Sequence, residues 1–251
     1  MELITSITAA GTAFAALPLH SGERAPTLLL FAMAGTDTLM TEPYCRVGRL
    51  LHARGWNVVS LDLPCHGADS RAGEPAELAG WAVRTAQGED IVAAFRQRVN
   101  DVVEHIVATG VADPARIAAA GTSRGGFMAF HAAAGNPRVQ AVAAFSPVTD
   151  LLALSEFAGQ EANQVVHRLA LLNAVAALAG RAVWITIGNA DERVGTGNAS
   201  AFARAMTAAS QARGLECGVT MHLLPTPGHT SLAEWHDQAA DWLGNRIAPK
   251  E

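Results

Sequence analysis

A serine framed by glycines stands near the middle of the chain, where an apolar run meets a helical pattern. Gly121, Ser123 and Gly125 have the spacing of a nucleophile elbow. The backbone of such a strand-to-helix turn is strained, so the positions two residues either side of the serine must lack bulk. The turn also places the serine at a helix N-terminus, where free N–H groups and the helix dipole favour negative charge. The spacing therefore predicts that Ser123 is a nucleophile for acyl transfer.

An acid and a base follow Ser123 along the chain. Asp191 comes just after an apolar run that ends at Ile187, and His229 comes just after one that ends at Leu224. A serine hydroxyl is too weak an acid to attack unless a base takes its proton, and imidazole titrates near neutrality. We therefore predict a triad in which His229 is the general base and Asp191 fixes the imidazole tautomer.

Other residues compete for these roles. Asp150 also follows a strand-like run, but Asp191 follows the penultimate strand, where the order serine, acid, histidine places the acid. Of the nine histidines, His229 is expected in a loop, just after a strand and a glycine. Positions inside strands or helices are expected for His222, His236, His131 and His105. The chain holds 23 glycines, so an inert serine in a glycine-rich turn is the alternative reading of the elbow.

The oxygen that becomes negative during acyl transfer needs two backbone N–H donors. One is the residue after the nucleophile, Arg124, and the second is expected from loop 34–38, which follows the first buried strand. We assign the second donor to Thr36, and the alternative is that Thr36 only caps the following turn. The Arg124 side chain has two interpretations, a contact with an acidic group of the substrate or an ion pair with a nearby carboxylate.

The elements that must position these residues alternate along the chain. Apolar runs predict strands at 3–7, 12–19, 27–33, 57–63, 116–121, 139–145, 182–187 and 219–224. Helical periodicity predicts helices after Pro43, near 78–81, at 89–109, after Ser123, at 198–213 and at 232–247. We expect Asp113-Pro114 to break the chain before the central strand. The alternation predicts an α/β fold, with a mostly parallel, doubly wound sheet of about eight strands in one domain over 1–251.

Segment 150–180 carries two amphipathic helical patterns and no strand. We interpret it as a small helical cap inserted between strands over one end of the sheet. Together with stretch 70–88 it is expected to form an acyl pocket, for which the candidates are Trp81, Leu154 and Phe157. The alternative for these three side chains is core packing beneath a loop.

Composition narrows the classes of partner. Half of the 251 residues are apolar, 16% are charged, and the formal net charge is −5. With this charge the protein has no basic surface of the kind that binds nucleic acid. No apolar run approaches the ~20 residues of a membrane span. The N-terminal stretch has no basic residue ahead of its apolar part, so it is not typical of a signal peptide.

Three cysteines lie far apart in the sequence, at Cys45, Cys65 and Cys217. Their odd number and the lack of a C-x-x-C pair argue against a disulfide framework or a zinc site and favour reduced thiols in the cytoplasm. We expect no metal and no cofactor, and a small-molecule ester as the partner, with no nucleic acid or membrane. The oligomeric state is left open between monomer and homodimer.

Several motifs resemble those of the α/β-hydrolase superfamily, in its prolyl-oligopeptidase and dienelactone-hydrolase branch. They are Asp113-Pro114-x-Arg116-Ile117 before Gly121-x-Ser123-x-Gly125-Gly126, then Ser146-Pro147-Val148-Thr149-Asp150-Leu151, and the earlier Asp62-x-Pro64-x-His66-Gly67. The resemblance extends from Thr27 onward and implies the α/β-hydrolase fold and hydrolysis by a Ser/Asp/His triad. The chain departs from the family at Ala34-Gly35, where the family often has His-Gly, and at the missing N-terminal propeller. The resemblance therefore implies an esterase-like enzyme without the peptide filter of prolyl oligopeptidases.

We therefore expect a serine hydrolase, in particular a carboxylesterase that cleaves esters of small or medium acyl groups through an acyl-enzyme on Ser123. Acetyl or aromatic-acyl groups on sugars are one form of this hypothesis. Two alternatives stay open: a small peptidase or amidase of the prolyl-oligopeptidase branch, and a hydrolase-fold binding protein whose triad is idle.

Overall fold

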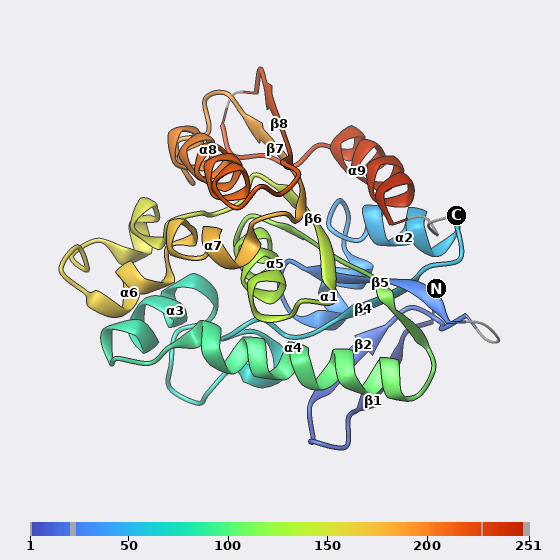
Figure 1. Ribbon diagram of the computed structural model, residues 1–251. Coiled ribbons are helices and arrows are strands. Elements are labelled where there is room, and N and C mark those ends of the chain that lie inside the picture. The colour runs from blue at the N-terminus through green and yellow to red at the C-terminus, as the bar shows by residue number, and fades with distance from the viewer. Residues whose placement is uncertain (1, 21–23, 227, 248–251) are drawn as a thin grey trace.

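An eight-stranded sheet forms the centre of the computed structural model, which describes residues 2–20, 24–226 and 228–247 (Figure 1). The strand order is β1-β2-β4-β3-β5-β6-β7-β8. Strand β2 is antiparallel to both of its neighbours, and the six strands from β4 to β8 in this order, including β3, are parallel. The strands are β1 (Ile4–Ile7), β2 (Ala13–Ala16), β3 (Ala25–Phe31), β4 (Asn57–Ser60), β5 (Ala112–Thr122), β6 (Val139–Phe145), β7 (Ala182–Gly188) and β8 (Gly218–Leu224).

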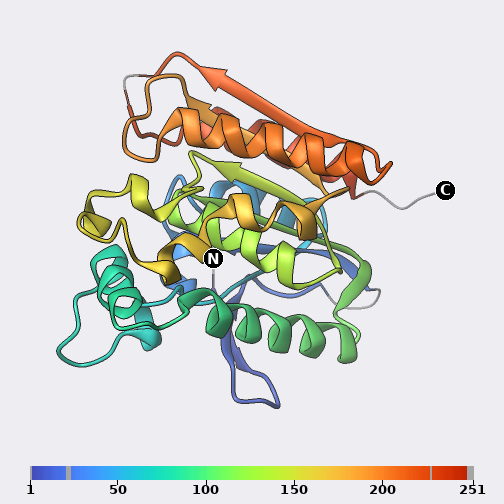
Figure 2. The same ribbon diagram turned by 60° about the vertical axis from the view of Figure 1, so that its left-hand side comes forward.

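Helices cover both faces of the sheet (Figures 1 and 2). One face carries α1 (Gly35–Met40), α2 (Arg46–His52) and α9 (Ala233–Arg246), whose apolar side chains join one core cluster. The other face carries α3 (Glu77–Ala86), α4 (Ile91–Ala108), α5 (Arg124–Gly135) and α8 (Thr196–Ala212), which join a second cluster. The predicted fold class, a mostly parallel doubly wound sheet, is confirmed.

Side-chain alternation along the strands explains how one sheet supplies both cores. In β3, Leu28 and Leu30 belong to the cluster under α1, α2 and α9, whereas Leu29 and Phe31 belong to the cluster on the opposite face. All four are at most 2% exposed. Each buried apolar side chain of this size contributes about 1.5–3 kcal/mol, so the continuous apolar run fixes β3 in the middle of the sheet.

The structure differs from the sequence-based expectation at two places near the site. Residues 34–38 were expected to form a loop, but α1 begins at Gly35 because the N–H of Thr38 donates to the carbonyl of Ala34 at 2.8 Å and closes a first helical turn. The Asp113-Pro114 pair was expected to break the chain, yet it lies inside β5. The strand tolerates Pro114 because the β3–β5 register is irregular between Ala112 and Ile117, where no ladder N–H is required.

The segment between β6 and β7, which the structure describes throughout and where two helical patterns and no strand were expected over 150–180, contains two short α-helices, three 3₁₀ turns and no strand. It consists of the 3₁₀ turns Leu151–Ala153, Ser155–Phe157 and Leu171–Asn173, with α6 (Gln164–Leu169) and α7 (Val175–Leu178). Gln160 Nε2 donates to the carbonyl of Ala82 at 2.9 Å, and Asn163 Nδ2 donates to that of Thr85 at 3.0 Å. These bonds attach the segment to α3, beside which it lies in both views (Figures 1 and 2).

Candidate active site

Ser123 occupies a tight turn between β5 and α5. Its φ of 54° lies in the left-handed region, which residues other than glycine adopt only when their surroundings hold them there. A Cβ on Gly121 would overlap the carbonyl of Gly125, and a Cβ on Gly125 would overlap the carbonyl of Phe31. The Ser123 N–H donates to the carbonyl of Phe145 at 2.8 Å. The glycines therefore permit the turn, and the neighbouring strands fix it.

Three side chains that are distant in the sequence meet at the carboxyl edge of the sheet. Nε2 of His229 lies 3.1 Å from Oγ of Ser123, and Nδ1 of His229 lies 2.8 Å from Oδ2 of Asp191. A carboxylate only accepts hydrogen bonds, so Nδ1 carries the hydrogen and the Nε2 lone pair faces the serine hydroxyl. The Asp191 side chain is 0% exposed and that of His229 is 30% exposed. The imidazole therefore stands between a buried anion and an accessible hydroxyl.

The loop after β7 holds the Asp191 carboxylate in place. Oδ1 of Asp191 accepts the N–H groups of Arg193 at 3.1 Å and Val194 at 3.3 Å, which leaves Oδ2 for the imidazole. The Arg193 guanidinium binds Glu156 at 2.5 Å, and this hydrogen bond lowers the pKa of the Glu156 carboxyl. Glu156 belongs to the segment between β6 and β7, so that segment braces the acid loop.

The loop after β8 is held by Ser146, which was seen in the sequence only as part of a family motif. Ser146, at the end of β6, is fully buried with a φ of 42°, and its Oγ donates to the carbonyl of Thr230 at 2.7 Å. Thr230 is the neighbour of His229. A serine directly after a buried strand, at the same edge as the triad, was the available signal. Pro227, part of the predicted Pro-Gly-His-Thr loop, lies outside the described residues.

The two expected oxyanion donors lie at helix starts. Arg124 is the first residue of α5, and Thr36 is the second residue of α1, so neither N–H has an acceptor inside its own helix. Asp62 was seen in the sequence only as part of a family motif. Its Oδ1 accepts the N–H of Gly35 at 2.7 Å, and its Oδ2 accepts that of Ala68 at 2.8 Å. Asp62 therefore fixes the backbone directly before Thr36.

The side chain of Arg124 forms an ion pair rather than standing free. Nη1 lies 2.7 Å from Oε2 of Glu77, and Nε donates to the carbonyl of Ala32 at 3.1 Å. Of the two interpretations of this guanidinium, the structure shows the pair with a nearby carboxylate.

The three candidates for an acyl pocket lie in the core instead. Trp81, Leu154 and Phe157 are 0%, 2% and 1% exposed, and all three belong to the core cluster around α5. The indole N–H of Trp81 donates to the carbonyl of Pro64 at 2.6 Å. The structure thus shows the packing alternative, because Trp81 on α3 and the other two residues in the segment after β6 are all buried in this cluster.

The competing residues have structural contacts of their own. Asp150 caps the turn that follows it, with Oδ1 accepting the N–H of Leu152 at 3.0 Å. His131 Nε2 lies 2.9 Å from the carbonyl of Leu169, and the His236 ring stacks on Phe145 at 3.9 Å. Burial lowers the pKa of both histidines to about 4.

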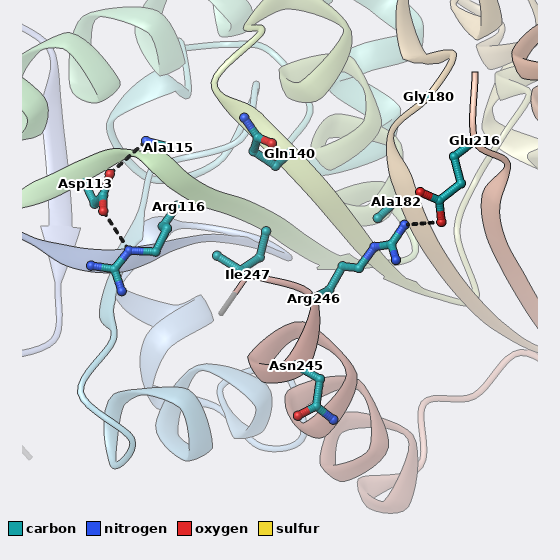
Figure 3. Close-up of a pocket in the computed structure, with 10 residues that line it drawn as sticks. All are labelled: Asp113, Ala115, Arg116, Gln140, Gly180, Ala182, Glu216, Asn245, Arg246 and Ile247. Carbon is teal, nitrogen blue, oxygen red and sulfur yellow. Dashed lines mark hydrogen bonds and ion pairs between the residues drawn. The ribbon is translucent and has the colours of Figure 1, made fainter. Parts of the chain in front are cut away.

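A hollow of about 800 Å³ opens at the opposite edge of the sheet, at the amino ends of β5 to β8 and the end of α9 (Figure 3). Its charged side chains pair with one another, Arg116 with Asp113 at 2.7 Å and Arg246 with Glu216 at 3.3 Å. Within the described ranges, no cluster of three or more His, Cys, Asp or Glu is arranged to hold a metal ion. Nor does any helix of those ranges have both the length and the hydropathy needed to cross a membrane.

Two family models match the sequence. That of the prolyl oligopeptidase family matches residues 92–249, which include the serine, acid and histidine positions. That of the acetyl xylan esterase family matches residues 12–159, which include residues 34–38 and Ser123. Each matched range covers more than half of the 251 residues. None of the curated proteins matches the sequence.

Solved structures resemble the chain over nearly its whole length. TT1662 from Thermus thermophilus gives a TM-score of 0.73 at 18% identity, covering 100% of both chains. A cold-adapted esterase from an Arctic intertidal metagenomic library gives 0.69 at 18% identity, over 98% of this chain and 93% of that chain. Porphyromonas gingivalis dipeptidyl peptidase 4 gives 0.72 at 18% identity over 98% of this chain, which spans only 35% of that protein. At these identities the likeness shows a shared fold.

Proposed function

Because the chain belongs to the prolyl oligopeptidase family of α/β-hydrolases and also matches the acetyl xylan esterase family, we propose that it is a carboxylesterase acting on esters of small or medium acyl groups. Serine hydrolase chemistry follows from these families, and the preference for esters is the proposal. The observation that carries it is the unbroken hydrogen-bond chain from Ser123 through His229 to Asp191.

The geometry fits a two-step acyl transfer. As Oγ of Ser123 attacks the ester carbonyl, Nε2 of His229 takes the hydroxyl proton, and the buried Asp191 carboxylate stabilises the imidazolium. The N–H groups of Arg124 and Thr36 receive the negative carbonyl oxygen. His229 then returns the proton to the leaving alcohol, which departs and leaves an acyl group on Ser123. A water molecule activated by His229 repeats the sequence and releases the acid.

Two observations support small acyl groups on esters. The acetyl xylan esterase model covers the segments that contain both oxyanion donors and the nucleophile. The large apolar side chains expected to line an acyl pocket are buried in the core, so they offer no surface to a long chain. An acetyl group or one of similar size is therefore the substrate class that these observations favour.

Pre-steady-state release of p-nitrophenol from p-nitrophenyl acetate tests the proposal. The wild type is expected to show a burst equal to the enzyme concentration, and Ser123→Ala is expected to show none, with an unchanged melting temperature. Ser70→Ala, at an exposed serine in a surface turn, serves as the matched control and keeps the burst. Thermal stabilisation by an ester without turnover would instead favour the binding-protein alternative.

The family match favours a peptidase or amidase as the second candidate. Amide cleavage depends more strongly on proton delivery from His229, because an amine leaves poorly unless it is protonated. Matched ester and anilide substrates with the same acyl group separate the two functions. An ester preference in kcat/KM supports the carboxylesterase, and an equal or greater rate on the amide supports the peptidase.

A further inference from the structure

The Arg124 side chain joins three segments that are far apart in the sequence. Its Nε–H donates to the carbonyl of Ala32, one residue beyond the end of β3, at 3.1 Å. Its Nη1 binds Glu77, the first residue of α3, at 2.7 Å. Arg124 itself begins α5, directly after the nucleophile. One guanidinium thus connects the elbow with the strand that leads into the oxyanion loop.

The elbow and the end of β3 are already in close contact beneath this guanidinium. A Cβ at Gly125 would overlap the backbone of Phe31 and Ala32, so the two chain segments touch there without an intervening side chain. Close packing sets how near the segments approach each other. A hydrogen bond of defined direction is what restricts sliding and rotation of the carbonyl at Ala32.

Glu77, which pairs with the guanidinium, has a constrained backbone. Its φ of 59° lies in the left-handed region, which a side chain such as glutamate rarely adopts. Its N–H donates at 3.0 Å to the carbonyl of Cys65, which itself has a φ of 59°. A backbone held in this region persists where the surrounding structure determines it, commonly beside functional sites. The side chain that pairs with Arg124 therefore extends from a constrained backbone position, although it is itself 56% exposed.

From these contacts we propose that Arg124 has a second role: its side chain positions the loop that carries Thr36. This contact holds the N–H of Thr36 in a fixed position relative to the N–H of Arg124, so that both can bind the same oxygen. This role rests on the proposed function, since it concerns the same oxyanion hole. Asp62 holds the loop by the N–H of Gly35, and Arg124 holds it by the carbonyl of Ala32. The loop is thereby fixed through a donor and an acceptor on either side of residues 33 and 34.

This role makes a kinetic prediction that differs from substrate binding. A positioning contact acts on the transition state, where the negative oxygen must lie within hydrogen-bond distance of both N–H groups. Loss of the contact should lower kcat with little change in KM. A guanidinium that binds substrate directly would give the opposite result, a raised KM with kcat retained.

Arg124→Met tests the positioning role, because it keeps the backbone N–H and the apolar stem while removing both polar contacts. We expect kcat on p-nitrophenyl acetate to fall roughly 10- to 100-fold, the range for misplacement of a catalytic donor. KM should change by less than about 3-fold. Arg138→Met is the control, since Arg138 forms a more exposed ion pair with Glu104 near the opposite end of β6. It should leave both constants unchanged.

Variants of Glu77 give a second, independent test of the positioning role. Glu77→Gln keeps an acceptor for Nη1 and should retain most of kcat, whereas Glu77→Ala should lower it. Adding Glu77→Ala to Arg124→Met should cause no further loss, because both act through one contact. An additive loss would contradict the role. If Arg124→Met fails to fold, Arg124→Lys and the Glu77 pair decide the matter by the same kinetic criterion.

The rate at which a fluorophosphonate labels Ser123 separates this proposal from the proposed function. Phosphonylation also develops a negative oxygen at the oxyanion hole, but it needs no ester specificity. Slower labelling of Arg124→Met supports the positioning role even if the wild type cleaves no ester. An unchanged labelling rate and an unchanged kcat overturn it. A wild type that is not labelled at all overturns both proposals.

Discussion

Asp191→Asn is the substitution whose effect the site predicts in most detail. Oδ1 of Asp191 accepts two backbone N–H groups, those of Arg193 at 3.1 Å and Val194 at 3.3 Å. In the asparagine variant the amide oxygen must take that side, because an NH₂ group there would face two donors. The NH₂ group is then directed at Nδ1 of His229. The imidazole must accept at Nδ1 and carry its hydrogen on Nε2, so it has no lone pair for the Ser123 proton.

The expected loss follows from this change of tautomer. Replacing the triad carboxylate by an amide in a Ser-His-Asp site lowers kcat by about 10⁴-fold while the geometry is kept. We expect a decrease in kcat/KM of ~10³- to 10⁴-fold at pH 7, or about 4–5 kcal/mol of transition-state stabilisation. Because the variant is isosteric and Asp191 is 2% exposed in a satisfied site, the fold should be retained.

The assay compares kcat/KM on p-nitrophenyl acetate for Asp191→Asn and Asp150→Asn, with melting temperatures for both. Asp150→Asn is the matched control, since its carboxylate caps a 3₁₀ turn and asparagine caps as well as aspartate. It should stay within about 2-fold of the wild type. The reasoning would be refuted if Asp191→Asn kept more than about a tenth of the activity, or if Asp150→Asn lost as much.

Two further predictions concern stability. Gly125→Ala should lower the unfolding free energy by about 3 kcal/mol, because the new Cβ meets the backbone of Phe31 rather than a movable side chain. Gly197→Ala, in α8 with nothing within 4 Å of the added Cβ, should instead leave the melting temperature equal or slightly higher. The second concerns acid: burial lowers the pKa of His131 and His236 to about 4, so the folded state binds fewer protons than the unfolded state between about pH 6.5 and 4. The contribution of each histidine to the unfolding free energy should therefore be full above pH 6.5 and fall by on the order of 3 kcal/mol as the pH decreases to 4. Urea unfolding at several pH values measures this decrease. His131→Gln should make the unfolding free energy depend less steeply on pH.

The parts of the site that follow strand ends were predictable from the sequence. Ser123, Asp191 and His229 each come directly after an apolar run, and parallel strands bring their carboxyl ends to one edge. The structure places the three side chains in contact, at 3.1 Å and 2.8 Å. A mostly parallel sheet was predictable, but the order of its strands was not, because the apolar runs specify burial and not which strands are neighbours.

The parts that depend on packing and on side-chain-to-backbone bonds were not predictable. Trp81 looks the same in sequence whether it lines a pocket or fills a core, and only the packing of α3 against the rest of the core decides between them. Asp62 and Ser146 act on backbone groups of Gly35 and Thr230. Those partners are distant in the sequence and carry no compositional signal, since any residue offers the same N–H or carbonyl.

The departure from the family at residues 34 and 35 has a physical explanation in these same bonds. Gly35 packs closely against the end of β4, since a Cβ there would lie 3.1 Å from the carbonyl oxygen of Ser60, and its N–H is held by Asp62. Ala34 contributes only its carbonyl, which accepts the N–H of Thr38 at 2.8 Å. The side chain of residue 34 has no part in holding the loop, so alanine can stand where the family often has histidine. What the loop needs is a glycine that approaches β4 closely, a carboxylate at the end of that strand, and the guanidinium of Arg124 on its other side.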